Sequence, residues 1–152
     1  MLPHLNKRLR DARGFTLVEL LVVIMIIAIL AAIAIPAYID HEKKGQDSSA
    51  ESNARNLVSK VELCYATYED YTQCQTQSAF GNDLGLDWGT NPGQVSVVNA
   101  TKTTYEVTAV SQASSDGSNH TYSITHSSSG TNNKTCTAGN SNDNGSCRNG
   151  TW

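Results

Sequence analysis

Glu19 is the acidic side chain whose position in the sequence most clearly requires a chemical partner. It lies directly before residues 20–35, a run of Leu, Val, Ile, Met and Ala that contains no polar residue. An ionised side chain near the centre of a membrane helix costs about 2.5–3.5 kcal/mol, so such residues usually pair with an opposite charge. The nearest basic residues along the chain are Arg13, before the run, and Lys43, well after it. Glu19 therefore needs a cation from another source.

A free α-amino group at Phe15 would supply that cation. If the chain were cut between Gly14 and Phe15, the new amino group and Glu19 would lie about one turn apart on one side of a helix. In a bundle of staggered copies, the amino group of one copy could equally meet Glu19 of another copy, which would neutralise both charges in an apolar core. The sequence thus predicts an ion pair that forms only after proteolysis.

Residues 15–35 form the element that positions Glu19. As an α-helix, these 21 residues would be roughly 31 Å long at ~1.5 Å per residue, which is enough to cross a bilayer core. A single apolar segment has no partner strands with which to close a barrel, so a helix is the membrane structure that satisfies its backbone. The preceding residues 1–14 carry a net charge of +3, which predicts that they stay in the cytoplasm and that residues 36–152 lie outside.

The segment from Lys7 to Ile39 resembles the class III signal of type IV pilins and of type II secretion pseudopilins. The similarity depends on the basic residues before Gly14 and on the motif Gly14-Phe15-Thr16-Leu17-Val18-Glu19. The resemblance implies that a prepilin peptidase removes residues 1–14 by cleaving after Gly14, that Phe15 is N-methylated, and that Glu19 governs subunit docking. It also implies a homopolymeric filament with these helices as its core, built by a pilus assembly machinery.

Two simpler interpretations of the same segment fit it less well. A secretory signal peptide has an apolar stretch of about 7–15 residues and a small-x-small cleavage site, which Ala32-Ile33-Ala34 would supply. Here the apolar run is longer, and Glu19 lies in its first part. A plain single-pass anchor explains the length and the basic flank but not the motif that contains Glu19.

Residues 36–69 are predicted to continue the helix as an amphipathic half. We expect kinks at Pro36, where type IVa pilins usually carry proline, and at Gly45, because both residues weaken helical hydrogen bonding or propensity. The charged and small residues 40–49 predict a bend or a melted turn. A polar face is expected at Glu51, Arg55, Lys60, Glu62 and Glu69. An apolar stripe at spacings of three or four residues should face the core: Ala50, Ala54, Leu57, Val61, Cys64 and Tyr68.

The remaining residues predict a small antiparallel sheet packed on this helix, so the expected fold class is α+β and pilin-like. Glycine and proline interrupt residues 70–93, which we interpret as a connecting loop with one short turn, pinned to the helix by Phe80, Leu84, Leu86 and Trp88. Residues 94–126 predict three or four strands, with turns at residues 99–102 and 114–119. Residues 127–152 are rich in Ser, Thr, Asn and Gly and predict a disulfide-braced loop region.

Four cysteines lie on the outer side of the membrane segment, so disulfides are expected. Four cysteines allow three pairings. We favour Cys64–Cys74 and Cys136–Cys147, because each pair is close in sequence and closes a segment that otherwise lacks apolar anchors. In the loop-entropy model, a closure of this size contributes up to about 3 kcal/mol.

Residues 140–145 superficially match the opening of a calcium loop, with oxygen-bearing side chains at alternate positions before a glycine. The final Glu of such a loop is absent, because Thr151 occupies its position, and only Asp143 is charged. A turn is the preferred interpretation, and calcium near Asn140–Asn144 is the alternative, which the resemblance to type II major pseudopilins supports.

No other cluster predicts metal binding, catalysis or nucleic-acid binding. His41, His120 and His126 are interpreted as surface residues, and the last two would stand ~20 Å apart along a strand, too far to share a metal. Motifs for serine hydrolases and phosphate binding are absent, so the chain is predicted not to be an enzyme and to need no cofactor. Residues 15–152 carry 7 basic and 13 acidic side chains, and this net charge of −6 argues against intrinsic nucleic-acid binding.

These features predict the structural subunit of a type IV pilus-like filament. Before assembly, the subunit would span the cytoplasmic membrane once with its amino terminus in the cytoplasm, and afterwards it would lie in an extracellular pilus. The braced C-terminal region favours a pilus subunit over the major pseudopilin of a type II secretion system. A membrane-anchored extracytoplasmic binding domain that needs no assembly is the alternative from another class.

Overall fold

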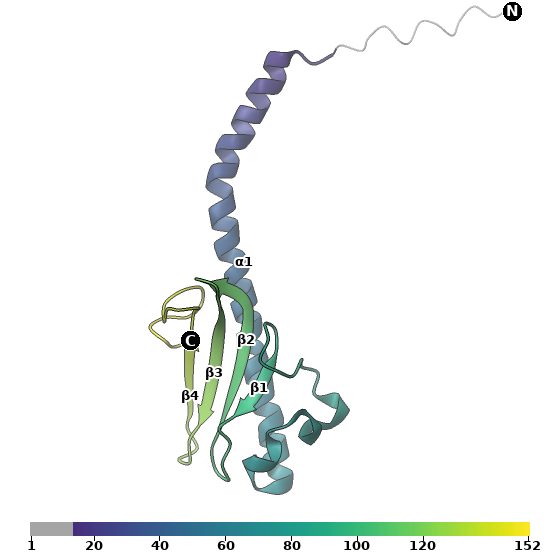
Figure 1. Ribbon diagram of the computed structural model, residues 1–152, viewed down its shortest axis with the longest axis vertical. Helices are drawn as coiled ribbons and strands as arrows, with labels where there is room; N and C mark the ends of the chain where they lie inside the picture. Colours follow the sequence, from purple (N-terminus) through teal and green to yellow (C-terminus); the bar gives the residue numbers. More distant parts are fainter. Residues whose placement is uncertain (1–13) are drawn as a thin grey trace, which may run out of the picture. The chain divides into compact units, whose positions relative to one another are not determined.

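The computed structural model describes residues 14–152, so the predicted leader, except for Gly14, lies outside the described residues. By its internal contacts the chain divides into two units, residues 1–38 and 39–152. The elements follow in the order α1 (Leu17–Tyr68), η1 (Tyr71–Cys74), η2 (Gln77–Asp83), β1 (Val95–Val98), β2 (Tyr105–Ser115), β3 (Ser118–His126) and β4 (Asn132–Thr137), where η marks a 3-10 helix (Figure 1).

In the first unit, helix α1 presents an uncovered apolar surface. The large apolar side chains from Phe15 to Ile35 are all between 46% and 90% exposed. Within residues 14–152, α1 is the one helix that is long and apolar enough to cross a membrane, by length and composition. An apolar patch of this extent marks a membrane or protein interaction surface. The predicted apolar half of the helix is confirmed as a helix.

Residues 40–49 are helical throughout, so the melted turn predicted there is wrong. Side-chain contacts outweigh the weak helix propensity of this segment. Lys44 Nζ lies 2.8 Å from Asp40 Oδ2 one turn away, and Asp47 is fully buried. Kinks at Pro36 and Gly45 stay a prediction, and both residues lie inside α1.

The second unit contains a four-stranded antiparallel sheet in the order β1-β2-β3-β4. Along β2, the buried residues alternate with partly buried or exposed ones, as the sequence predicted. Strands β2 and β3 form a hairpin whose last pair, Ser115 and Ser118, is joined by Asp116-Gly117. Both turn residues have positive φ, 53° and 77°, which is the conformation of a two-residue type I′ turn. The predicted turn within residues 114–119 is therefore confirmed.

Strand β4 lies inside residues 127–152, which the sequence predicted to be a loop region. Its residues pair in register with residues 121–126 of β3. The sequence Asn-Asn-Lys-Thr-Cys-Thr has no apolar alternation, so backbone pairing with the free edge of β3 specifies this strand. The prediction is corrected accordingly, and irregular structure after the sheet begins at residue 138.

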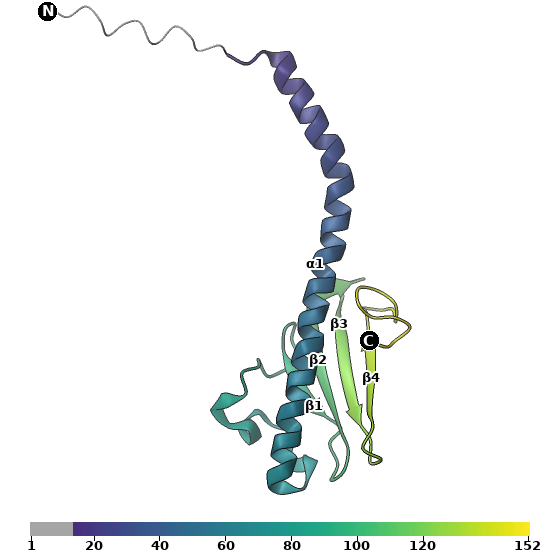
Figure 2. The same ribbon diagram turned by 180° about the vertical axis from the view of Figure 1, so that it is seen from behind.

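Helix α1 covers one face of the sheet within the second unit (Figure 2). Its buried residues Asp47, Ala50, Ala54, Leu57, Val61 and Cys64 include five of the six predicted stripe positions. These five stripe residues pack with apolar residues of β1, β2 and β3. Tyr68, the predicted end of the stripe, is 56% exposed. Tyr65 contacts the core instead, because its ring stacks on Tyr71 of η1 with the centroids 4.1 Å apart.

The connecting segment 70–93 contains the two 3-10 helices η1 and η2, where the sequence predicted one short turn. Leu84 is buried, and Phe80, Leu86 and Trp88 pack against the core, as predicted. The rings of Phe80 and Trp88 lie 5.7 Å apart. These aromatic side chains therefore hold the segment to the core and do not form an exposed platform.

Candidate functional site

Glu19 closes a capping box at the start of α1. Thr16, directly before the helix, donates its backbone N–H to Glu19 Oε2 (2.9 Å) and its hydroxyl to the same oxygen (2.8 Å). The N–H of Glu19 donates in turn to Thr16 Oγ1 (3.2 Å). This reciprocal pattern satisfies backbone donors that the first helical turn leaves free, and it places the carboxylate at the positive end of the helix dipole.

Thr16 is not among the predicted partners of Glu19, although Thr-x-x-Glu before an apolar run is the sequence signal of a capping box. Gly14 and Phe15 lie just outside the helix, and the Phe15 side chain is 90% exposed. A Cβ added at Gly14 would meet no atom within 4 Å. Among the described residues, none therefore covers the predicted cleavage site, while cleavage after Gly14 and methylation of Phe15 stay predictions.

Both predicted disulfides are present. Cys64–Cys74 joins α1 to η1 with a Cα–Cα distance of 6.1 Å, and Cys136–Cys147 joins β4 to the segment after it with a Cα–Cα distance of 5.8 Å. All four cysteines are buried. The described part of the chain contains no free cysteine.

His120 is fully buried, which corrects its prediction as a surface residue. Its Nδ1 lies 3.0 Å from both carboxylate oxygens of Asp47, and its Nε2 lies 2.9 Å from Ser115 Oγ. His120 lies on the inner face of β3 with Tyr122 and Ile124. The alternation of residues along a strand is therefore the sequence signal that could have predicted its burial. The Asp47 carboxylate and the His120 imidazole stabilise each other, because each gives the other a hydrogen-bond partner in place of the water lost on burial.

The order Asp47–His120–Ser115 matches that of a hydrolase triad, but Ser115 has no room to act as a nucleophile. Its side chain is buried, and its Oγ already accepts hydrogen bonds from Asn144 Nδ2 (2.8 Å) and Lys43 Nζ (3.5 Å). The hydroxyl is therefore already held by three side chains, Asn144, Lys43 and His120. The arrangement thus satisfies buried polar groups.

Glu62, predicted on the polar face of α1, binds two tyrosines. Tyr105 donates its hydroxyl to Glu62 Oε1 (2.7 Å), and Tyr71 donates to Oε2 (3.0 Å). His126, predicted at the surface, is partly buried, because its ring stacks on Tyr105 at 5.0 Å and its Nδ1 lies 3.8 Å from Glu62 Oε1. His41 is exposed, as predicted. Helical periodicity could not indicate this cluster, because its other members come from η1, β2 and β3.

Three tyrosines have strongly perturbed hydroxyl groups. Burial, together with the hydrogen bonds to the Glu62 carboxylate, raises the pKa of Tyr71 and Tyr105 well above the ordinary value near 10. Burial also raises the pKa of Tyr122, and the nearby Asp47 carboxylate adds to this shift. All three tyrosines are therefore held in the neutral form.

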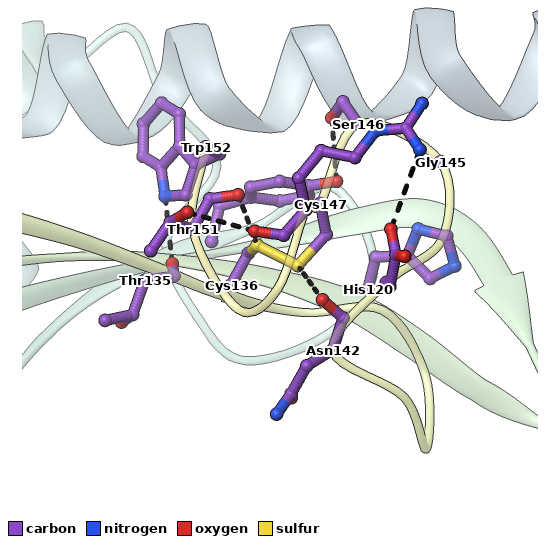
Figure 3. Close-up of a disulfide and its surroundings, with 12 residues drawn as sticks. His120, Thr135, Cys136, Asn142, Gly145, Ser146, Cys147, Thr151 and Trp152 are labelled. Atoms are coloured by element: carbon purple, nitrogen blue, oxygen red, sulfur yellow. Dashed lines mark hydrogen bonds and ion pairs between the residues drawn. A yellow bond between two sulfur atoms is a disulfide. The ribbon is translucent and has the colours of Figure 1, made fainter.

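Trp152 attaches the C-terminal loop, residues 138–152, to the sheet and to α1. Its Nε1 donates to the carbonyl oxygen of Thr135 (2.9 Å), as Figure 3 shows. The guanidinium carbon of Arg55 and the ammonium of Lys134 lie 4.9 Å and 4.5 Å from the indole ring, and Tyr122 meets the ring edge-on. Cations at these distances are attracted by the face of the ring.

The predicted calcium loop makes protein contacts. Asn140 Nδ2 donates to the carbonyl oxygen of Asp116 (3.2 Å), and Asp143 lies 3.6 Å from Arg148 in an ion pair. Among the side chains that the structure describes, no group of three or more from His, Cys, Asp or Glu is arranged to hold a metal. Calcium near Asn140–Asn144 stays the untested alternative to a turn, and isothermal titration calorimetry with calcium would test it.

The amino-terminal segment matches a known family model. Residues 9–35 match the prokaryotic N-terminal methylation motif. The match includes Gly14, Phe15 and Glu19, the residues that the sequence singled out. No solved structure matches the chain significantly.

Several curated pilus proteins are similar to the chain. It is 36% identical over 99 residues to the type IV wide pilus major component of Thermus thermophilus, which covers 64% of this chain and 72% of that protein. It is 33% identical over 107 residues to a fimbrial protein of Pseudomonas aeruginosa, and this match covers 66% of this chain and 69% of that protein. It is 35% identical over 77 residues to the type IV major pilin protein of Myxococcus xanthus, of whose length it spans only 35%. Because the proteins from Thermus thermophilus and Pseudomonas aeruginosa are more than 30% identical to the chain over more than two thirds of their length, the chain belongs to the type IV pilin family.

Proposed function

We propose that this chain is the structural subunit of a type IV pilus-like surface filament made of identical copies. The observation that carries the proposal is the uncovered apolar part of α1, with Glu19 at its start. Burial of apolar surface is worth about 25 cal/mol per Å², so packing these helices together in a filament core would stabilise the assembly. Relatives named as pilus components and fimbrial proteins support the same function.

Glu19 changes its partner during assembly in this proposal. In the uncleaved chain the carboxylate accepts hydrogen bonds from Thr16. Cleavage after Gly14 creates the Phe15 amino group next to it, and the carboxylate then pairs with that cation in its own subunit or in a neighbour. Two charges that neutralise each other in an apolar core fix the register of the helices, because an unpaired charge there is costly.

The proposed location follows from the same residues. The subunit spans the cytoplasmic membrane once before assembly, with the basic leader in the cytoplasm, and enters the extracellular filament afterwards. Its partners are identical subunits, a prepilin peptidase and the pilus assembly machinery. The subunit itself is proposed to have no catalytic role and no intrinsic affinity for nucleic acid.

The deciding experiment substitutes Glu19→Ala and uses Glu42→Ala as the matched control, because Glu42 is an exposed acid on the same helix outside the apolar run. We expect mass spectrometry to find both variants cleaved and starting at methylated Phe15. Electron microscopy should show few fibres for Glu19→Ala and normal fibres for Glu42→Ala. Normal fibre yield from Glu19→Ala would overturn the role of this carboxylate.

The cleavage site has its own test. Gly14→Leu should block removal of residues 1–14 and leave the subunit in the membrane, although no atom among the described residues opposes a side chain at this position. Native protein that starts at Met1 or Ile35 would instead favour a membrane-anchored binding domain. Secretion defects without surface fibres in a deletion strain would favour a major pseudopilin.

A further inference from the structure

Noncovalent contacts hold the segment just before Cys147 onto α1 and the β2–β3 hairpin. The N–H of Ser146 donates to Asp47 Oδ2 (3.2 Å), and its hydroxyl donates to Glu51 Oε1 (2.6 Å). Asn144 Nδ2 donates to Ser115 Oγ (2.8 Å), which in turn contacts His120. We name the set Asp47, Glu51, Ser115, His120, Asn144 and Ser146 the Asp47 network. In Figure 3, Ser146 lies on the side of the disulfide that faces the helix.

The centre of the Asp47 network is fully buried. Asp47 and His120 have no exposed surface, and every buried polar atom of the side chains that the structure describes has a hydrogen-bond partner. If the segment that carries Ser146 left, Asp47 would lose a donor in a place that water does not reach. A buried charge that loses a donor is destabilised, so the network favours the docked segment.

The partner cysteine is held by separate contacts. Cys136 pairs with Tyr122 in the β3–β4 register, and its N–H donates to the carbonyl oxygen of Gly150 (2.9 Å). The hydroxyl of Tyr122 lies 2.9 Å from Ser146 Oγ. Tyr122 therefore connects the strand pair that holds Cys136 with the network that holds Cys147, independently of the bond between the two sulfur atoms.

Gly145 shows how closely the segment is fitted. Its φ is +61°, and an added Cβ would collide with Asp47 Oδ2 and crowd His120 Cε1 at 3.2 Å. A side chain at this position would push the segment away from Asp47. The fit leaves little freedom in where Cys147 is presented.

We infer that the Asp47 network positions Cys147 against Cys136 and thereby selects this bond among the three pairings open to four cysteines. Formation of the bond needs an oxidised disulfide reagent. The thiolate of one cysteine attacks that reagent to give a mixed disulfide, and the second thiolate displaces the reduced thiol. Two protein thiols lose two protons and two electrons, and the reagent disulfide becomes two thiols. The network takes no part in the chemistry. It holds the Cys147 thiol near the Cys136 thiol and so raises the effective concentration of one at the other.

The experiment compares Asp47→Asn with Asp40→Asn in the full chain in detergent, reduced, denatured and then refolded with reduced and oxidised glutathione. Asp40 is an exposed acid of the same helix, so its variant controls for lost charge. Thiols are trapped by alkylation and disulfides are mapped by mass spectrometry. We expect the equilibrium constant for closing Cys136–Cys147 to fall roughly tenfold in Asp47→Asn. A change of this size corresponds to the loss of one hydrogen bond to a charged group. Mispaired disulfides should also appear. Closure of Cys64–Cys74 and the behaviour of Asp40→Asn should match the wild type.

Wild-type closure of Cys136–Cys147 in Asp47→Asn would overturn the inference. If Asp47→Asn loses both disulfides, the variant has failed to fold, and Ser146→Ala becomes the deciding variant. It removes only the hydroxyl contacts to Glu51 and Tyr122. Ser146→Ala should weaken Cys136–Cys147 alone, and an unchanged constant would contradict the inference. In the double variant Cys136→Ala, Cys147→Ala, the Ser146 amide should remain protected from hydrogen exchange, whereas full exposure of that amide would show that the disulfide holds the segment and not the reverse.

Discussion

Among single residues, Tyr105 tests the cluster around Glu62 most directly. The Tyr105 ring is buried, and its hydroxyl donates to Glu62 Oε1 over 2.7 Å. Tyr105→Phe keeps the ring and removes the donor, so we expect the free energy of unfolding to fall by about 1–3 kcal/mol. Denaturant unfolding of the full chain in detergent measures the change. Tyr68→Phe is the matched control, because Tyr68 is 56% exposed. Equal losses in the two variants would contradict the importance of this hydrogen bond.

Residue-level predictions succeeded where the signal is local in sequence. The family motif that contains Gly14 to Glu19 and the two short-loop disulfides depend on neighbouring residues, so the sequence was enough to find them. The roles assigned to Gly14, Phe15 and Glu19 stay predictions. The pair Asp47 and His120 could not be predicted in this way, because its members are 73 residues apart and meet only when a helix face and a strand face come together. The capping box of Thr16 is also local, because Thr16 and Glu19 stand three residues apart, so its sequence signal was sufficient to predict it.

At the scale of elements, replacing glycine with alanine should change the free energy of unfolding in opposite directions in a helix and in a turn. Gly45 lies inside α1 with open space around it, so Gly45→Ala should raise the free energy of unfolding by about 0.5–1 kcal/mol. Gly117 has φ of +77° in the β2–β3 turn, so Gly117→Ala should lower it by about 1–2 kcal/mol. Chemical denaturation compares the two variants. A shift in the same direction for both would refute this account of their backbone conformations.

The packing of α1 on the sheet has a control on the same helix. Leu57 is fully buried, whereas Leu63 is 66% exposed. Leu57→Ala should cost about 2–5 kcal/mol, because it removes apolar contacts and leaves a cavity. Leu63→Ala should change the free energy of unfolding by no more than about 0.5 kcal/mol. Unfolding midpoints by circular dichroism would give both values, and similar losses would mean that the apolar stripe is assigned to the wrong face.

Elements with a regular spacing of apolar residues could be predicted from the sequence. Elements that form because their backbone pairs with another strand could not. The apolar positions from Ala50 to Cys64 and the alternation in β2 follow from side-chain spacing. Strand β4 consists largely of polar residues, and it exists because β3 offers it a backbone edge. The helix across residues 40–49 likewise depends on burial of Asp47 by distant segments, which overrides its weak local propensity.

For the molecule as a whole, alkaline pH should reveal the three buried tyrosines. The pKa of Tyr71, Tyr105 and Tyr122 is raised in the folded chain, so above about pH 10 the unfolded state loses protons that the folded state keeps. This contribution to stability is complete below pH 10 and declines as the pH rises above it. Unfolding curves on both sides of pH 10 should show falling stability, with a shallower fall for Tyr105→Phe. Constant stability across this range would contradict the raised pKa values.

The environment of Trp152 also gives the protein an intrinsic optical probe. Its indole is flanked by Arg55 and Lys134 and touches Tyr122, whereas Trp88, the other tryptophan, lies in the segment before β1. In a Trp88→Phe background, the fluorescence of Trp152 would come from one site, where two nearby cations shift and quench its emission. Detachment of residues 138–152 would remove those cations and change the colour and intensity of the emitted light. Undocking of this loop could then be followed in real time without attaching a dye.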